Sequence, residues 1–351
     1  MTAIKKVQII IIILIILPVS VVLSRSINFT GQSSITGFNN PLYSQPSFEY
    51  RLQYIPTISL ENQYNNSGLF DAEWAIDFNY TSHFDSLSMT NYRSWIRFKS
   101  NDVEIRAGIQ KLNFGPAKLF RPLQWFDTLN PIDPLQLTPG INAVRFRKEM
   151  TQTSYYMMWI IHKTDEMISL EPHQSKNRSN EFGGRYQTLT KYGEIGVTSH
   201  FRFIEPGVEK LPEFRLALDG SFDMGINSWF ESVFIKSKEE SGFIDFQQIT
   251  TIGVDYTFDL GNGFYSSLEA YRYYSSGQNI SSSTTEKLGA LFSYPLSIFD
   301  NFTSISYYDL ELKKSFQYLS WQRAYDNLTL NAGLFLYQST AGYQIILTYY
   351  H

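Results

Sequence analysis

The sequence predicts an all-β fold, a transmembrane antiparallel β-barrel of about 18 strands. Apolar and polar residues alternate through most of the chain after residue 24, which is the period of strands with two unlike faces. Aromatic residues make up 16% of the 351 residues and charged residues 18%, a balance that favours strands over helices. The alternating segments run for about 9 to 12 residues, enough to cross a bilayer at a tilt, whereas strands of soluble proteins average about 5 to 6.

Residues 1–24 differ in composition from the rest of the chain. The basic leader "MTAIKK" precedes the apolar run "VQIIIIILIILPVSVVLS", and polar residues follow at once. This order predicts a secretory signal peptide that is cleaved after Ser24. An uncleaved N-terminal membrane anchor is the alternative. With cleavage, residues 25–351 form a single barrel domain.

The segment 92–110, "YRSWIRFKSNDVEIRAGIQ", shows why the barrel should hold water. Apolar residues such as Ile105 and Ile109 share one face of the predicted hairpin, and arginines share the other. Lipid outside and water inside account for both faces, and closure leaves no unpaired strand edge in lipid. We therefore expect a pore lining that includes Arg93, Arg97, Glu104, Arg106, Arg145 and Arg147. A secreted or periplasmic β-sandwich or β-helix is the alternative.

The strand count follows from parity. Both ends of a single-chain bacterial barrel lie in the periplasm, so the number of strands is even. Counting back from the C-terminus gives 17 segments to Phe48, and residues 27–38 supply one more; 16 strands result if segments merge. Periplasmic turns should be short, as near Asn101 and Gly225, whereas extracellular loops should be longer, as at 81–91 and 274–285.

Residues 111–140 form the longest predicted connection. Five of the 13 prolines lie in it, which rules out a regular strand. Its aromatic and aliphatic side chains can bury apolar area, so the loop should fold rather than stay disordered. We expect it to fold into the barrel as a constriction, with Phe114, Arg121, Trp125, Asp127 and Asp133 as its candidate residues.

Two motifs in this part of the chain resemble a known family. "EIRAGIQKLNFG", followed by "LNPIDPLQL", is similar to a pattern in the alginate-export-like outer-membrane porins and their uncharacterised relatives in Bacteroidota. The resemblance covers residues 92–148. It implies an outer-membrane barrel of about 18 strands with a polar pore. It implies no particular substrate.

The composition argues against several other functions. The chain has no cysteine, so it has no disulfide framework and no thiolate metal site. A formal net charge of −4 argues against nucleic acid as a partner. The five histidines form no metal-binding spacing, and no G-x-S-x-G motif is present. We therefore expect no catalytic residue, no metal and no cofactor, and we do not expect an enzyme.

These features predict a passive channel in the bacterial outer membrane for small polar or anionic solutes. Its partners would be outer-membrane lipid, solutes in the lumen and the barrel-assembly machinery. The alternative is a non-conducting barrel that acts as a scaffold or adhesin through its loops. The arginines leave two interpretations open: an electropositive stripe that guides anions, or Arg–Glu pairs that brace the wall.

Overall fold

The fold is described from a computed structural model of the chain. It describes residues 25–39, 48–64, 68–83, 85–162, 179–205, 210–238, 241–338 and 340–351. No helix in these ranges combines the length and the apolar character that crossing a membrane requires. The predicted signal peptide, residues 1–24, lies outside the described residues.

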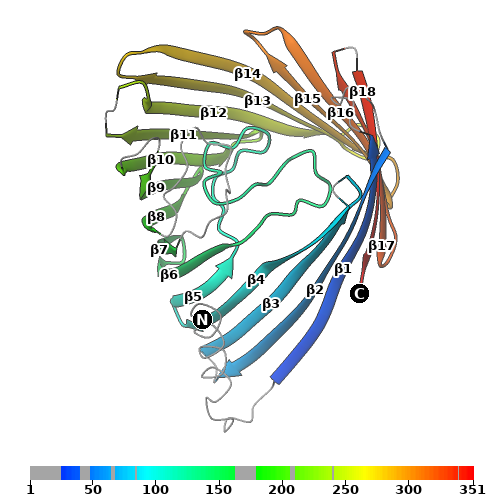
Figure 1. The fold of residues 1–351 in the computed structure, drawn as a ribbon, viewed down its shortest axis with the longest axis horizontal. Helices are drawn as coiled ribbons and strands as arrows, with labels where there is room; N and C mark the ends of the chain where they lie inside the picture. Colours follow the sequence, from blue (N-terminus) through cyan, green and yellow to red (C-terminus); the bar gives the residue numbers. More distant parts are fainter. Residues whose placement is uncertain are drawn as a thin grey trace.

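The described chain forms 18 strands in one antiparallel sheet, in which consecutive strands are neighbours (Figure 1). The first nine strands are β1 Arg25–Asn39, β2 Phe48–Tyr64, β3 Gly68–Thr81, β4 Ser86–Ser100, β5 Val103–Gln110, β6 Ile141–Thr151, β7 Ser154–His162, β8 Asn180–Thr190 and β9 Gly193–Ile204. The others are β10 Leu211–Asp223, β11 Asn227–Ser237, β12 Ile244–Phe258, β13 Phe264–Gly277, β14 Ile280–Pro295, β15 Asp300–Asp309, β16 Lys314–Ala324, β17 Leu328–Tyr337 and β18 Thr340–Tyr350.

The sheet closes where β1 pairs with β18. The register runs from Gln32 opposite Tyr350 to Asn39 opposite Tyr343. His351 extends this seam by one residue, because its N–H donates to the Gly31 carbonyl at 3.1 Å and its carbonyl accepts from the Gly31 N–H at 3.0 Å. Closure pairs the backbone groups of both terminal strands, as lipid requires.

The structure confirms the closed antiparallel barrel and the count of 18, so the alternative of 16 strands is wrong. The weakly patterned residues 27–38 lie in β1, the strand that parity requires. The C-terminus and the short connections, such as 101–102 and 224–226, lie at one end of the barrel, which by the rule for such barrels faces the periplasm.

Two predicted extracellular loops are shorter than expected. Instead of a loop at 274–285, β13 continues to Gly277 and β14 begins at Ile280. Instead of 81–91, the connection between β3 and β4 spans 82–85. Both predictions failed because the backbone pairing of these strands continues beyond the residues that show the lipid-facing alternation. Beyond the hydrocarbon, polar side chains on both faces are compatible with a strand whose backbone stays paired.

The outer wall is apolar and the inner wall polar over the β4–β6 region. Ile105, Phe98 and Val144 are 42%, 49% and 51% exposed on the outside. The register of β3 against β4 shifts between Ala75 and Ile76, so Tyr92 is an extra residue in β4. This bulge changes the parity: Met89 faces outward before it, and Phe98 after it.

Ile105 and Arg106 test this assignment of faces, because neighbouring residues of a strand point to opposite sides of the wall. The variant Ile105→Arg places a charge in lipid and should lower the free energy of unfolding by roughly 2–4 kcal/mol. Arg106→Ile should lower the free energy of unfolding much less. Urea unfolding in lipid vesicles measures both, and the reverse order would contradict the assignment.

Closure through β18 predicts that deleting residues 342–351 abolishes assembly. The deletion would leave unpaired edges on β17 and β1, which lipid cannot satisfy. We expect no heat-modifiable folded band and no protein in the outer membrane. Deleting His351 alone is the control and should preserve folding, because the pairs from Gln32–Tyr350 onward remain. Insertion of the longer truncation would refute closure by this seam.

Candidate functional site in the barrel lumen

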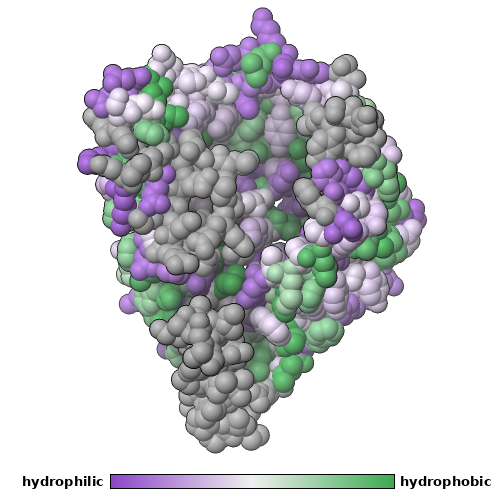
Figure 2. All heavy atoms as spheres, in the orientation of Figure 1, coloured by the Kyte–Doolittle hydropathy of each residue, from purple (hydrophilic) through white to green (hydrophobic). Residues whose placement is uncertain are grey.

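Residues 111–140, the inward loop, lie inside the ring of strands and cross its interior (Figure 1). The loop follows β5 directly and ends where β6 begins, so both of its ends are fixed by the wall. Figure 2 shows a hollow in this face of the molecule with hydrophilic residues around it. The inward loop and the wall that faces it form the candidate site.

The loop packs on the wall at two apolar clusters, which we call its footings. The first footing lies on β6, β7, β10 and β11. Phe114 stacks on Trp159 with ring centroids 5.2 Å apart, and Phe126 meets the same indole edge-on at 5.7 Å. The buried members of this cluster are Leu112, Phe114, Leu123, Trp125, Phe126, Ile141, Ala143, Met157, Trp159, Ile161, Ala217, Val233 and Ile235. Burial of this apolar area holds the loop against one side of the lumen.

The second footing lies on β14–β17. Leu119 of the loop is buried with Ile305 and Tyr318, and partly buried residues pack around them: Phe120, Ile132, Leu291, Tyr307, Phe316 and Phe335. Gly289 of β14 makes room for the loop here. A Cβ at Gly289 would lie 2.8 Å from a ring carbon of Phe120 and 2.9 Å from a methyl carbon of Leu119.

Glu231 of β11 binds the backbone of the loop from within the wall. Its Oε1 accepts the Ala117 N–H at 2.8 Å and its Oε2 accepts the Leu123 N–H at 3.0 Å. Gly115 allows this approach, because it has a positive φ of 85° and a Cβ there would lie 2.1 Å from Oε1 of Glu231.

Glu269 of β13 makes a second anchor of the same kind. Its Oε1 accepts the Lys118 N–H at 2.7 Å, and its Oε2 accepts the N–H groups of Leu119 and Phe120 at 3.0 and 2.7 Å. The Trp229 indole N–H donates to Oε1 at 3.1 Å. Three of these four donors are backbone N–H groups that a proline-rich loop cannot pair in a sheet, and the carboxylate satisfies them.

The Lys118 side chain continues this anchor toward the periplasmic end. Its ammonium group pairs with Asp255, donates to the Tyr265 hydroxyl at 2.5 Å and lies 4.7 Å from the Trp229 ring centroid. Burial lowers the pKa of Lys118, but the hydrogen bonds to Asp255 and Tyr265 outweigh it and hold the pKa above its ordinary value. The lysine therefore stays charged in the lumen.

The five predicted constriction residues lie in the loop in different surroundings. Phe114 and Trp125 are buried in the first footing. Arg121 donates to both carboxylate oxygens of Asp127, at 2.7 and 3.2 Å, and Asp127 is buried. Asp133 is half-buried, and its Oδ1 accepts the Leu135 N–H at 3.0 Å. Four of the five therefore brace the loop, and a constricting role for the set stays a prediction.

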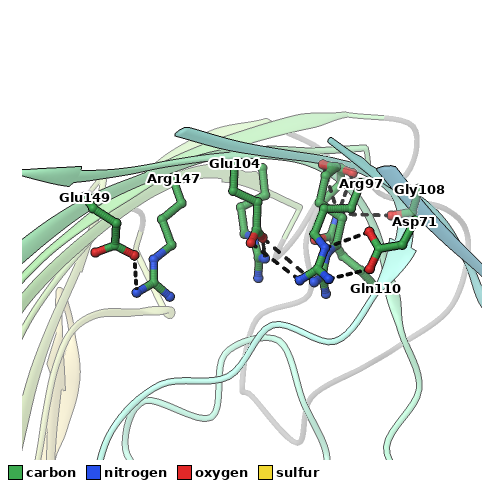
Figure 3. Close-up of polar contacts among 10 residues, drawn as sticks. Asp71, Arg97, Glu104, Gly108, Gln110, Arg147 and Glu149 are labelled. Carbon is green, nitrogen blue, oxygen red and sulfur yellow. Dashed lines mark hydrogen bonds and ion pairs between the residues drawn. The ribbon is translucent and has the colours of Figure 1, made fainter. Parts of the chain in front are cut away.

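Three of the predicted pore-lining arginines form one row across the wall, the arginine row. Arg97 of β4 is opposite Arg106 of β5, which is opposite Arg145 of β6. Glu104 pairs with all three: with Arg145 most closely, with Arg97 at 3.6 Å and with Arg106 at 3.8 Å. Figure 3 shows Arg97 and Glu104 projecting from the wall to the side on which the inward loop lies.

Asp71 of β3 completes the arginine row by pairing with Arg97. Two carboxylates thus serve three guanidinium groups, which leaves one positive charge. The buried Nε atoms of Arg106 and Arg145 have no hydrogen-bond partner in the part of the chain that the structure describes. The row braces the wall, yet it keeps unused donors and a small excess of charge.

Arg93 and Arg147 do not belong to the arginine row. Arg93 is buried and donates to the carbonyls of Tyr92 at 2.6 Å and Thr138 at 2.9 Å, so it ties the wall to the end of the inward loop. Arg147 pairs with Glu149 at 2.7 Å, and its guanidinium carbon lies 4.0 Å from the Tyr155 ring centroid.

A buried ionic network on β8–β10 lies beside the first footing. Arg185 donates to both oxygens of Asp219, each at 2.7 Å, and Arg202 and Arg215 donate to Glu213 at 2.5 and 2.9 Å. His200 meets Glu181 at 2.9 Å; the other charged members are also buried. No pattern in the sequence indicates that the inward loop covers these residues.

Glu231 is the functional residue that sequence reasoning missed. It lies in "INSWFESVFIKS", whose apolar residues occupy both faces, so the alternation identifies no inner face there. Trp229, Val233 and Ile235 are apolar although they point inward, and all three are buried because the inward loop covers this part of the wall. An isolated glutamate between inward apolar residues of a barrel strand is the signal that could have found this anchor.

Comparison with solved structures relates the fold to outer-membrane porins. The chain is similar to OccD3 (OpdP) of Pseudomonas aeruginosa, with a TM-score of 0.59, 10% identity, and coverage of 95% of this chain and 92% of that one. It is similar to OmpT, an outer-membrane protein of Vibrio cholerae, with a TM-score of 0.58 and 8% identity, and the match covers 94% of this chain and 100% of that one. It is also similar to Salmonella typhi OmpF, solved with daunomycin, with a TM-score of 0.53 and 12% identity, and the match covers 93% of this chain and 97% of that one.

No family model matches the chain. No curated protein matches it either. The closed barrel of 18 strands has the fold of bacterial outer-membrane porins, and the protein is located in the bacterial outer membrane. The resemblance to alginate-export-like porins of Bacteroidota stays a prediction.

The anchor at Glu269 predicts that Glu269→Ala loosens the inward loop. The change leaves three backbone N–H groups and one indole N–H without their acceptor, which should cost about 1–3 kcal/mol in the free energy of unfolding. Trypsin should cut the folded variant faster after Lys118. Glu194→Ala, at an exposed site near a periplasmic turn, is the control. Equal cleavage rates for the two variants would refute the anchor.

Proposed function

We propose that this protein is a porin-like channel for the passive diffusion of small polar or anionic solutes across the outer membrane. The observation that carries the proposal is the part of the wall that both footings of the inward loop leave uncovered. In the described ranges, β1–β4 and β18 contribute no residue to either footing. The inner face of these strands is mostly polar, with the partly or fully exposed Gln32, Arg51, Gln53, Glu73 and Asp77 among its residues. A polar wall that the loop footings leave uncovered suits the passage of solutes in water.

The charges of this wall favour a weak rather than a strong selection of ions. The arginine row has one excess positive charge after its pairing with Glu104 and Asp71, but Glu61, Glu73 and Asp77 also lie on β2 and β3, the neighbouring strands. These mixed charges argue against a conduit for a uniform polyanion, although residues 92–148 resemble the alginate-export-like porins. Guidance of anions and bracing of the wall are compatible roles for the row, and we propose both.

The alternative function, a non-conducting scaffold or adhesin, is favoured by the firm anchoring of the inward loop. Two apolar footings and two carboxylate anchors hold the loop across the lumen. A loop held this way could close the lumen as well as narrow it. Residues 1–24 would direct export, and the barrel-assembly machinery would insert the chain in either case. We propose no catalytic activity for it.

Ion selectivity tests the channel. We expect ohmic single-channel currents in planar bilayers and a weak anion preference, seen as a reversal potential in a KCl gradient. Replacing Arg97, Arg106 and Arg145 by Gln together should move this potential toward cation selectivity while conductance persists, because the wall then loses its positive groups. The shift should shrink as salt rises, since screening acts over about 10 Å at 0.1 M.

The control is Arg272→Gln, because Arg272 is an exposed arginine paired with Glu286 away from the arginine row. It should leave the reversal potential unchanged. A folded protein that passes no current would instead favour the scaffold. If the reversal potential is the same in the triple variant as in the natural protein, the role of the arginine row is to brace the wall.

A further inference from the structure

Six aromatic rings form a continuous series on the inner wall, the ring row. Phe120 of the inward loop stacks on Tyr271 of β13 with centroids 5.1 Å apart and meets Tyr307 of β15 at 5.3 Å. Tyr307 lies 6.2 Å from Phe316 of β16, which lies 6.3 Å from Phe335 of β17. Phe335 is 4.9 Å from Tyr318.

The two ends of the ring row have different surroundings. Phe120 of the loop covers Tyr271 and Tyr307. Phe316 and Phe335 are partly exposed, and no ring of the loop stacks on them among the described contacts. Phe316 lies two residues after the start of β16, and Phe335 lies two residues before the end of β17. Both therefore lie near the extracellular mouth of the lumen, where an entering solute would meet them first.

The wall makes room for the Tyr318 ring of this row. At Gly333 of β17 a Cβ would lie 2.7 Å from a ring carbon of Tyr318 and 2.8 Å from its hydroxyl oxygen. The glycine therefore leaves the space that the Tyr318 ring occupies. Gln344 of β18 donates to the Tyr318 hydroxyl at 2.9 Å, so an amide and a hydroxyl border the rings.

We propose that the outer end of the ring row binds sugars, with Phe316 and Phe335 as stacking surfaces and the partly exposed Gln344 as a polar partner. A sugar ring has C–H faces that pack on the negative face of an aromatic ring, and hydroxyls at its edge that need hydrogen bonds. Aromatic residues with a few convergent polar groups are the usual lining of a small-molecule site. This inference rests on the proposed channel function and names a solute class for it.

The same rings also support the inward loop, so the experiment has to separate the two roles. Leu119 and Ile132 of the loop give the second footing aliphatic contacts that need no ring. Replacing Phe316 and Phe335 by Leu keeps apolar side chains in place and removes the stacking faces. Replacing both by Tyr keeps the stacking faces. Phe302→Leu, at an exposed position on the outer wall, is the matched control.

Ligand-observed saturation-transfer NMR on the folded barrel in detergent would measure binding of maltotriose, a neutral sugar, and of benzoate, an aryl anion. We expect maltotriose to bind the natural protein, and its Kd to rise about 5- to 10-fold in the Phe316→Leu/Phe335→Leu variant. The Tyr variant and Phe302→Leu should keep the natural Kd. Heat-modifiable mobility would verify folding of each variant.

Several results would overturn the sugar site. An absence of maltotriose binding, or a Kd unchanged in the double Leu variant, would leave the ring row as a support for the loop alone. A loss of benzoate binding with maltotriose unaffected would assign aryl solutes instead. Conductance is measured separately. Sugar binding that depends on the rings, in a protein that passes no current, would refute the channel function and support the sugar site. Current without such binding would support the channel function and refute the sugar site.

Discussion

The structure depends on one constraint: within lipid, the backbone N–H and C=O groups of the wall must be paired inside the protein. Closure through β1 and β18 satisfies it, and His351 continues the pairing past the end of the last strand. A ring of 18 strands then encloses more space than wall side chains alone can fill. Whatever this barrel does therefore depends on how that interior is occupied, and the inward loop occupies a large part of it.

The inward loop meets the same backbone constraint by another route. Its prolines prevent it from joining the sheet, so its N–H groups need acceptors of a different kind. Glu231 and Glu269 supply them, each from a wall strand and each with both oxygens. A carboxylate suits this role because charge-assisted hydrogen bonds are stronger than neutral ones. The position of the loop is thus set by two acids in the wall as well as by its apolar footings.

Much of the fold could be predicted, because lipid enforces a strict period of two on strands that face water on the other side. The bounds of the inward loop, 111–140, match the end of β5 and the start of β6. Where lipid no longer acts, as near Ser86 and Ile280, the strand ends were predicted wrongly. The candidate site was harder to predict from the sequence. Cross-strand order could bring Arg97, Arg106 and Arg145 together, but contacts between the loop and Glu231 join residues more than 100 positions apart and leave no local pattern.

Some wall strands are apolar on both faces, and this has one physical cause. On β7, Met157, Trp159 and Ile161 are buried inward, while Met158 and Ile160 are exposed outward. Such strands are apolar on both faces because lipid covers one face and the loop covers the other. By contrast, β3 faces inward with the partly exposed Glu73 and Asp77. Loss of alternation therefore carries information of its own. In a lipid-embedded barrel, a wall strand that is apolar on both faces marks where the interior is filled. Alternation alone does not show that water remains, because β9 alternates and its inward His200 and Arg202 are buried.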